Sequence, residues 1–320
     1  MDLHLLIDNL TNPALLFFFL GLIAVQLKSD LAIPDNSSKF ISIYLLFSIS
    51  FKGGQELSHS EFDSEVWYGL AAGILLAVLV PIYTFFILKK KLSVENSGAI
   101  AAAYGSVSAV TFITAISFLN MESIDYGGHM VAVMALMEAP SIIVGMALIY
   151  LFVGKQNDGL SFGQILKHSI TNGSVLLILG SLLIGFIANE QQARGIEPFT
   201  TDIFKGFLAI FLLDMGIASG KGLATFFKNG WFTFWFAIVI PLINGSIMAV
   251  ISGSFLELEG NRFLLSILAA SASYIAVPAA MRMVVPKANP SLYIPMALAV
   301  TFPFNITLGM PIYLYLIQVF

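Results

Sequence analysis

The hydrophobic pattern divides the chain into ten apolar segments separated by short polar loops. A helix needs about 20 apolar residues to cross the roughly 30 Å hydrocarbon core of a bilayer, and these segments reach or approach that length. The seventh segment is short, and the fourth and ninth are interrupted by polar residues. The pattern predicts an all-α integral membrane protein with ten transmembrane helices, near residues 13–27, 39–52, 66–88, 97–118, 129–153, 169–188, 203–219, 231–252, 262–283 and 291–318.

Each interruption contains two serines that are two residues apart. Ser106 and Ser108 lie in the fourth segment directly after Gly105, and Ser271 and Ser273 lie in the ninth. Lipid offers no hydrogen-bond partner to polar groups at mid-membrane, and glycine lowers the cost of local unwinding. We therefore expect both helices to be broken there, as in the binding sites of many transporters.

The two halves of the chain resemble each other. Leu46–Leu57 matches Leu212–Leu223, the two serine pairs correspond, and the matched positions are 162 to 166 residues apart. Five segments per repeat is an odd number, so the second repeat must run inverted relative to the first. We expect a first repeat at 1–153, a cytoplasmic linker at 154–168 and a second repeat at 169–320.

Charge predicts the orientation of these segments. The loops after every odd-numbered segment carry or border eleven of the fifteen Lys and Arg residues, which places those loops in the cytoplasm and both termini outside. Hydrophobic residues make up 58% of the chain and charged residues 11%, against about 25% charged in soluble domains.

Several function classes are disfavoured by composition. The chain has no cysteine, which excludes disulfides and thiolate metal sites, and its four histidines lack a metal-binding spacing. It has no basic patch interleaved with aromatic residues for nucleic acid and no phosphate-binding lysine loop for ATP. No nucleophile and base are paired as in an enzyme.

Glu138 is the main candidate for ion coupling. It lies near the middle of the fifth segment, and Pro140 beside it removes a backbone hydrogen bond and frees a carbonyl. A buried carboxylate with a free carbonyl suits Na⁺ or a proton. The alternative is a protonated glutamate that is hydrogen-bonded within the helix bundle.

Four other polar residues could complete the site. Asp214 in the seventh segment could bind an ion, cap a helix or bond to a neighbouring helix. Asn305 and Thr307 follow Pro303 and could supply oxygen ligands or pack against the proline kink. Thr111 lies close to the first break, where it could contribute a ligand or serve packing.

The serine pairs could bind a small polar substrate through hydroxyl and backbone N–H groups. Helix N-termini beside such breaks carry partial positive charge and favour an anion. No Lys or Arg lies in mid-segment, so dipoles and a co-bound cation would hold that anion. The alternative is that the serines only allow helices to pack closely.

Five motifs give the chain a family resemblance, which extends over essentially its whole length. They are residues 51–54 (FKGG), 104–108 (YGSVS), 137–140 (MEAP), 269–273 (AASAS) and 285–294 (VPKANPSLYI), the last being the most specific. The chain resembles the sodium-dependent bicarbonate transporters, the SbtA-like permeases. The resemblance implies a core domain and a gate domain that move against each other, homotrimers, and a bacterial inner-membrane location.

The resemblance also implies that substrate and ion lie between the fourth and ninth helices. Tyr274 departs from the cyanobacterial members, which carry an acid at this position. The linker lacks their long polar insertion, which argues against a PII-like regulator. We expect substrate contacts from Gly105, Ser106, Ser108, Ser271, Ser273 and Tyr274, and sodium binding or coupling by Glu138, Thr111, Asn305 and Asp214.

These observations predict a Na⁺-coupled symporter of a small anion, with bicarbonate as the leading candidate. We expect no catalytic residues, no cofactor, and no metal other than the transported sodium. The alternatives are a Na⁺/H⁺ exchanger or a symporter of another small carboxylate or an inorganic anion. A channel or a membrane sensor is a further possibility, and a channel would show flux without coupling.

Overall fold

A computed structural model describes residues 11–59, 64–153, 173–226, 230–274, 277–278, 280–281, 285 and 287–320. Every regular element in these ranges is a helix. Six helical spans are long and apolar enough to cross a membrane, and two shorter apolar helices accompany them. The chain is therefore a multi-pass helical membrane protein. The expected linker at 154–168 lies outside the described residues.

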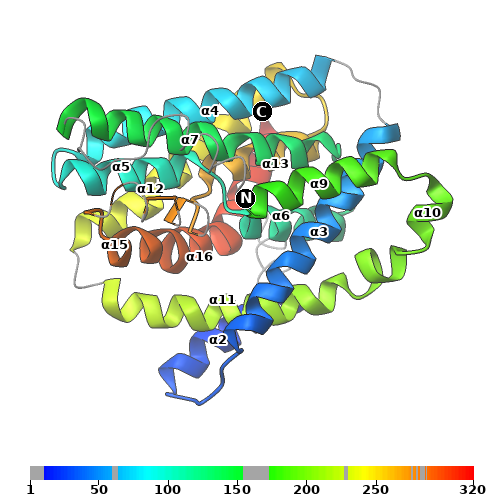
Figure 1. Cartoon of the computed structure of the whole chain (residues 1–320), viewed down its shortest axis with the longest axis horizontal. Coiled ribbons are helices and arrows are strands. Elements are labelled where there is room, and N and C mark those ends of the chain that lie inside the picture. The colour runs from blue at the N-terminus through cyan, green and yellow to red at the C-terminus, as the bar shows by residue number, and fades with distance from the viewer. Residues whose placement is uncertain are drawn as a thin grey trace.

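One group of helices forms the larger part of the molecule (Figure 1). In it α4 packs against α5 and α7. α12 packs against α13 and against the last helical segment, which is the continuous run of helical turns from Pro290 to Val319. Its members are α4 (Ser64–Leu88), α5 (Val94–Gly105), α6 (Ala109–Glu122), α7 (His129–Val153), α12 (Trp231–Ile251), η3 (Ser252–Ser254), α13 (Glu259–Ala270), α15 (Pro290–Pro295), η4 (Met296–Thr301), α16 (Phe302–Phe304), η5 (Asn305–Gly309) and α17 (Met310–Val319).

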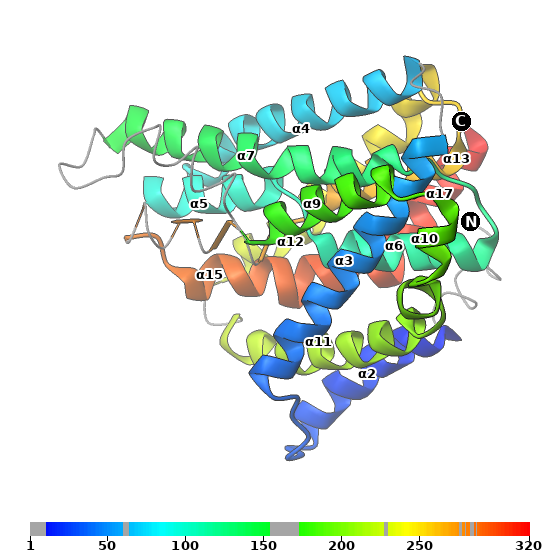
Figure 2. The ribbon, with the colours of Figure 1, turned by 45° about the vertical axis from the view of Figure 1, so that its right-hand side comes forward.

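A second group consists of two tightly packed helix pairs. In both ribbon views α2 lies along α11 below the larger group, and α3 lies beside α9 (Figures 1 and 2). The members are α2 (Pro13–Gln26), α3 (Asp35–His59), α9 (Gly173–Ile187) and α11 (Phe204–Phe226), with the short α10 (Glu190–Arg194) and η1 (Pro198–Asp202) between the last two.

Glycines make both of these helix pairs possible. A Cβ added at Gly21 of α2 would lie 2.3 Å from the carbonyl oxygen of Leu213, and one at Gly216 of α11 would lie 2.1 Å from that of Phe18. The backbones therefore touch directly, since only a residue without Cβ permits this approach.

The pair of α3 and α9 is built in the same way. A Cβ at Gly54 would lie 2.0 Å from the carbonyl oxygen of Leu182, and one at Gly185 would lie 2.0 Å from that of Phe51. Each pair thus joins a helix from the first half of the chain to a helix from the second half.

The two predicted helix interruptions are confirmed. The fourth segment ends as α5 at Gly105 and resumes as α6 at Ala109. The ninth segment ends as α13 at Ala270, after which Ser271 and Ser273 are extended or irregular. The backbone leaves the helix in nearly the same way at both places, with φ and ψ of −85° and −173° at Ser106 and of −85° and 168° at Ser271.

Asparagines tie the starts of α5 and α13 to distant loops in equivalent ways. The side-chain oxygen of Asn96 accepts the N–H of Asn289 at 2.8 Å, and that of Asn261 accepts the N–H of Gly127 at 2.7 Å. The two asparagines are 165 residues apart, and their two partners are 162 residues apart. These distances along the chain are the offsets that the sequence repeat predicts.

The prediction that the seventh segment is short was wrong. α11 has 23 residues, and a span of 25 residues runs from Pro198 to Gly222. α3 also has 25 residues and extends past both ends of the predicted 39–52. Hydropathy underestimates both helices because Lys, Gln, Glu and Gly residues near their ends lower the average without ending the helix.

The last helical segment is also less regular than predicted. It contains π-helical turns at Met296–Thr301 and Asn305–Gly309, on either side of Pro303. Wide turns of this kind interrupt regular helix bonding and are frequent beside functional sites.

The Gly185→Ala substitution should destabilise the protein, because its Cβ would collide with the backbone of α3. Overpacking of this kind costs about 1–3 kcal/mol. Gly180→Ala on the same helix is the matched control, since a Cβ there meets nothing within 4 Å. Thermal unfolding in detergent should show a lower midpoint for Gly185→Ala only. Equal midpoints would contradict the close crossing of α3 and α9.

Candidate functional site

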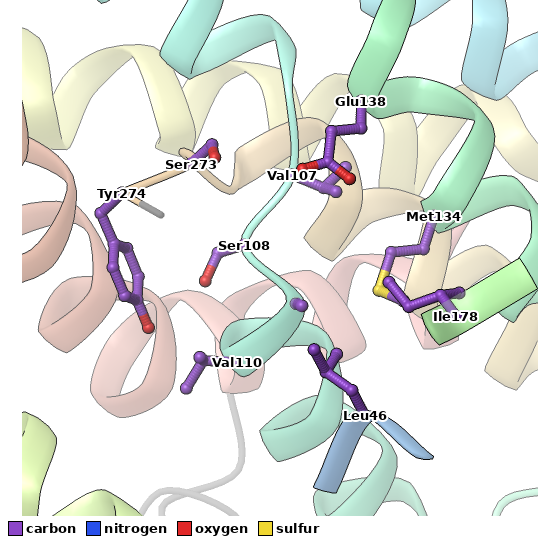
Figure 3. A pocket seen from close by; sticks show the side chains of 10 residues that line it. Leu46, Val107, Ser108, Val110, Met134, Glu138, Ile178, Ser273 and Tyr274 are labelled. Atoms are coloured by element: carbon purple, nitrogen blue, oxygen red, sulfur yellow. The ribbon is translucent and has the colours of Figure 1, made fainter. Parts of the chain in front are cut away.

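A cavity of about 40 Å³ lies where the two broken helices approach each other (Figure 3). It lies between the two groups of helices, because α3 and α9 of the second group form one wall. The lining residues are Leu46, Val107, Ser108, Ala109, Val110, Met134, Glu138, Ile178, Ser273 and Tyr274.

Four of the predicted site residues are brought together here. Ser108 comes from the first break, Ser273 and Tyr274 come from the second, and Glu138 comes from α7. They supply all the polar side chains among the lining residues. The rest of the wall is aliphatic or thioether, and no Lys or Arg belongs to the lining as far as the structure describes the chain.

The two breaks satisfy each other's backbone groups. The N–H of Ser273 donates to the carbonyl oxygen of Ala103 at 2.8 Å. The N–H of Ser108 donates to the hydroxyl of Ser271 at 3.2 Å, and that hydroxyl donates to the carbonyl of Leu268 at 3.1 Å. Unwound backbone inside a membrane protein is stable here because each unwound segment supplies hydrogen-bond partners for the other.

The second serine of each pair accepts a backbone N–H from beyond the break, and Ser108 is the N-cap of α6. Ser108 accepts the N–H of Thr111 at 3.1 Å, and Ser273 accepts the N–H of Val277 at 3.3 Å. Serine is a preferred N-cap because its oxygen satisfies one of the free N–H groups there. The N-terminus of α6 therefore opens at the cavity, where its partial positive charge favours an anion.

Glu138 carries the only carboxylate among the described lining residues. Its side chain is 7% exposed and points from α7 toward the first break (Figure 3). Within the part of the chain that the structure describes, no group donates a hydrogen bond to it and no cation pairs with it. A charged carboxylate so buried is costly unless a cation or a proton accompanies it.

The first break also contains Gly105 and Ser106. The hydroxyl of Ser106 is fully buried and has no hydrogen-bond partner among the described residues, although it does not line the cavity. A Cβ at Gly105 would lie 2.2 Å from Cγ of Pro81, so this glycine admits α4 close to the break. Gly105 thus allows tight packing at the point where the helix is interrupted.

The remaining candidates lie away from the cavity lining. Asn305 donates to the carbonyl of Ala270 at 2.8 Å and so caps the end of α13. Thr111 is buried, and its backbone N–H donates to the Ser108 hydroxyl at the start of α6. Asp214 accepts a hydrogen bond from Ser38 and lines another pocket.

The apolar residues of the wall were not predicted as site residues. Leu46, Met134 and Ile178 each belong to a different helix, and their chemistry does not distinguish them from other apolar residues. Leu46 lies in the stretch that matches Leu212–Leu223, and residues 134–136 (MAL) recur at 296–298. These matches are the one signal in the sequence that could have selected Leu46 and Met134.

One comparison with known proteins gives a result over nearly the whole chain. A family model described as the Na⁺-dependent bicarbonate transporter superfamily matches residues 13–318, which include both breaks and Glu138. A search of curated proteins finds no match.

The Ser271→Ala substitution should weaken the contact between the two breaks, because it leaves the N–H of Ser108 buried without an acceptor. Such a group costs about 1–3 kcal/mol. Ser266→Ala is the control, since Ser266 is equally buried on α13 and bonds only within its helix, to the Arg262 carbonyl. We expect a lower unfolding midpoint and faster amide exchange at Ser108 for Ser271→Ala alone. The same loss in both variants would contradict this role.

Proposed function

The chain belongs to the Na⁺-dependent bicarbonate transporter superfamily, and from this premise we propose that it is a symporter of Na⁺ and a small anion, with bicarbonate as the first candidate. The observation that carries the proposal is the cavity in which an unpaired carboxylate, Glu138, faces the serine-capped start of a helix. One group favours a cation and the other an anion, so this arrangement favours binding of both ions at the breaks.

Coupling follows from charge. A small anion bound by Ser108, Ser273 and the N-terminus of α6 would lie in the same cavity as the Glu138 carboxylate and would be repelled by it. Na⁺ beside Glu138 would remove that repulsion. Because no Lys or Arg lines the cavity among the described residues, we propose that the cation comes from solution. Each ion therefore raises the affinity for the other, by the same factor in both directions.

We also propose that the fold consists of ten spans in two inverted repeats. The equivalent breaks at Ser106 and Ser271, the equivalent bonds of Asn96 and Asn261, and the two glycine crossings support this symmetry. In this proposal the second helix group is the gate domain and the larger group is the core. The cavity between them would be exposed to either side in turn as they move.

The charge of the loops supports a placement of both termini outside. The family resemblance supports homotrimers in a bacterial inner membrane, and the short linker argues against a PII-like regulator. These assignments complete the proposal.

Na⁺/H⁺ exchange is a second candidate, and the unpaired state of Glu138 favours it. One carboxylate that binds Na⁺ and H⁺ in competition suffices for exchange. In that case a pH gradient would drive Na⁺ flux without any added anion.

Uptake of radiolabelled bicarbonate into proteoliposomes under an imposed Na⁺ gradient tests the proposal. Symport predicts accumulation that requires Na⁺, saturates with it and collapses when the gradient is removed. Competing carboxylates and inorganic anions define the selectivity. Na⁺-independent flux would indicate a channel, and proton-driven Na⁺ flux without anion would indicate the exchanger.

The Glu138→Gln substitution should lower Na⁺-driven uptake by about 10²-fold, because a buried charge interaction of this kind is worth about 2–5 kcal/mol. Glu190→Gln is the control, since Glu190 lies in an exposed ion pair with Arg194. Initial rates at varied Na⁺ concentration measure the effect. Uptake retained in Glu138→Gln at the wild-type Na⁺ dependence would remove Glu138 from the coupling site.

A further inference from the structure

A second cavity lies directly behind one wall of the site. It has a volume of about 610 Å³ and lies among α3, α9, α11 and the last helical segment. Leu46 and Tyr274 line both this cavity and the small one at the breaks, and they are the residues that the two described linings share. These two side chains therefore form the partition between a small polar cavity and a large, mostly apolar one.

Contacts on three sides hold the ring of Tyr274 in this partition. Its hydroxyl approaches the sulfur of Met215 on α11 at 3.7 Å. Its ring packs edge-on against Phe302, with centroids 6.3 Å apart. The side chain extends from the second break past Ser108, as Figure 3 shows. The position of the ring is thus fixed by the core and by a helix of the second group.

The volumes give the partition a consequence for selectivity. A cavity needs about 10–15 Å³ to hold one water-sized group, so about 40 Å³ holds roughly three. This space holds no more than a compact anion such as bicarbonate or acetate, whereas further methylenes need room of the kind that the second cavity offers.

We propose that Tyr274, together with Leu46, sets the upper size limit of the transported anion. The substrate class is a small, compact oxyanion, and a ring at position 274 excludes carboxylates with longer chains. This inference rests on the proposed function, because it concerns the same cavity. Removal of the ring would join the two cavities and admit longer anions into a space lined mostly by apolar residues, with Ser38, Lys39 and Ser42 also in its lining.

The test compares uptake of labelled bicarbonate, acetate, propionate and butyrate into proteoliposomes under a Na⁺ gradient. A single methylene changes kcat/KM by about tenfold or more where a pocket excludes it. Wild type should therefore discriminate at least tenfold between acetate and propionate. Tyr274→Ala should lose most of that discrimination, and Tyr274→Phe should keep it.

Leu46→Ala and Leu177→Ala form a matched pair. This pair tests the proposal even if both tyrosine variants fail to fold. Both change leucine to alanine, but Leu46 lies in the partition and Leu177 lines only the large cavity. Leu46→Ala should relax the size limit and Leu177→Ala should leave it unchanged. Unchanged selectivity in both Leu46→Ala and Tyr274→Ala overturns the proposal. Faster bicarbonate uptake with unchanged selectivity also overturns it, since the ring would then act as a gate.

Binding separates this inference from the proposed transport activity. The shift in unfolding temperature of purified protein in Na⁺ is measured with the same four anions. Stabilisation of wild type by acetate or bicarbonate only, and of Tyr274→Ala by butyrate as well, supports the size limit even where uptake fails. The proposal is overturned if butyrate stabilises wild type. It is also overturned if no anion stabilises either protein.

Discussion

Two unwound segments of backbone meet in the middle of this protein, and the structure depends on the hydrogen bonds that they exchange. The Ser273 N–H bonds to the Ala103 carbonyl, and the Ser108 N–H bonds to the Ser271 hydroxyl. Neither break would be stable alone in lipid, where an unpaired backbone group costs several kcal/mol. Together they form a small region in which polar groups lie close to a cavity without being exposed to the bilayer.

This arrangement explains why so few polar side chains suffice at the site. The first serine of the second pair supplies an acceptor across the contact, and the second serine of each pair accepts a backbone N–H from beyond its break. The side-chain amide of Asn305 donates a hydrogen bond to the Ala270 carbonyl at the end of α13. With these backbone groups satisfied, the N-terminus of α6 and the Glu138 carboxylate are the charged features at the described part of the cavity, and the rest of its wall is largely aliphatic.

The positions of the breaks were predictable because serine pairs in apolar segments have few explanations, and because they recur at one offset. The role of Glu138 as a cavity residue was predictable for a similar reason. Contacts between residues that are far apart in the sequence were not predictable. Gly105 serves contact with Pro81, and the amide of Asn305 is used by the Ala270 carbonyl. The length of α11 was underestimated because average hydropathy does not detect where a helix with polar ends stops.

The glycine crossings have a consequence for how the protein is made. α2 packs on α11, and α3 packs on α9, so each early helix has its closest partner in the later half of the chain. During synthesis, α2 and α3 enter the membrane more than a hundred residues before those partners. Their glycine-lined faces stay open to lipid or to other chains throughout that interval. The two halves therefore cannot fold independently, and the helix pairs are complete only after α11 has been synthesised.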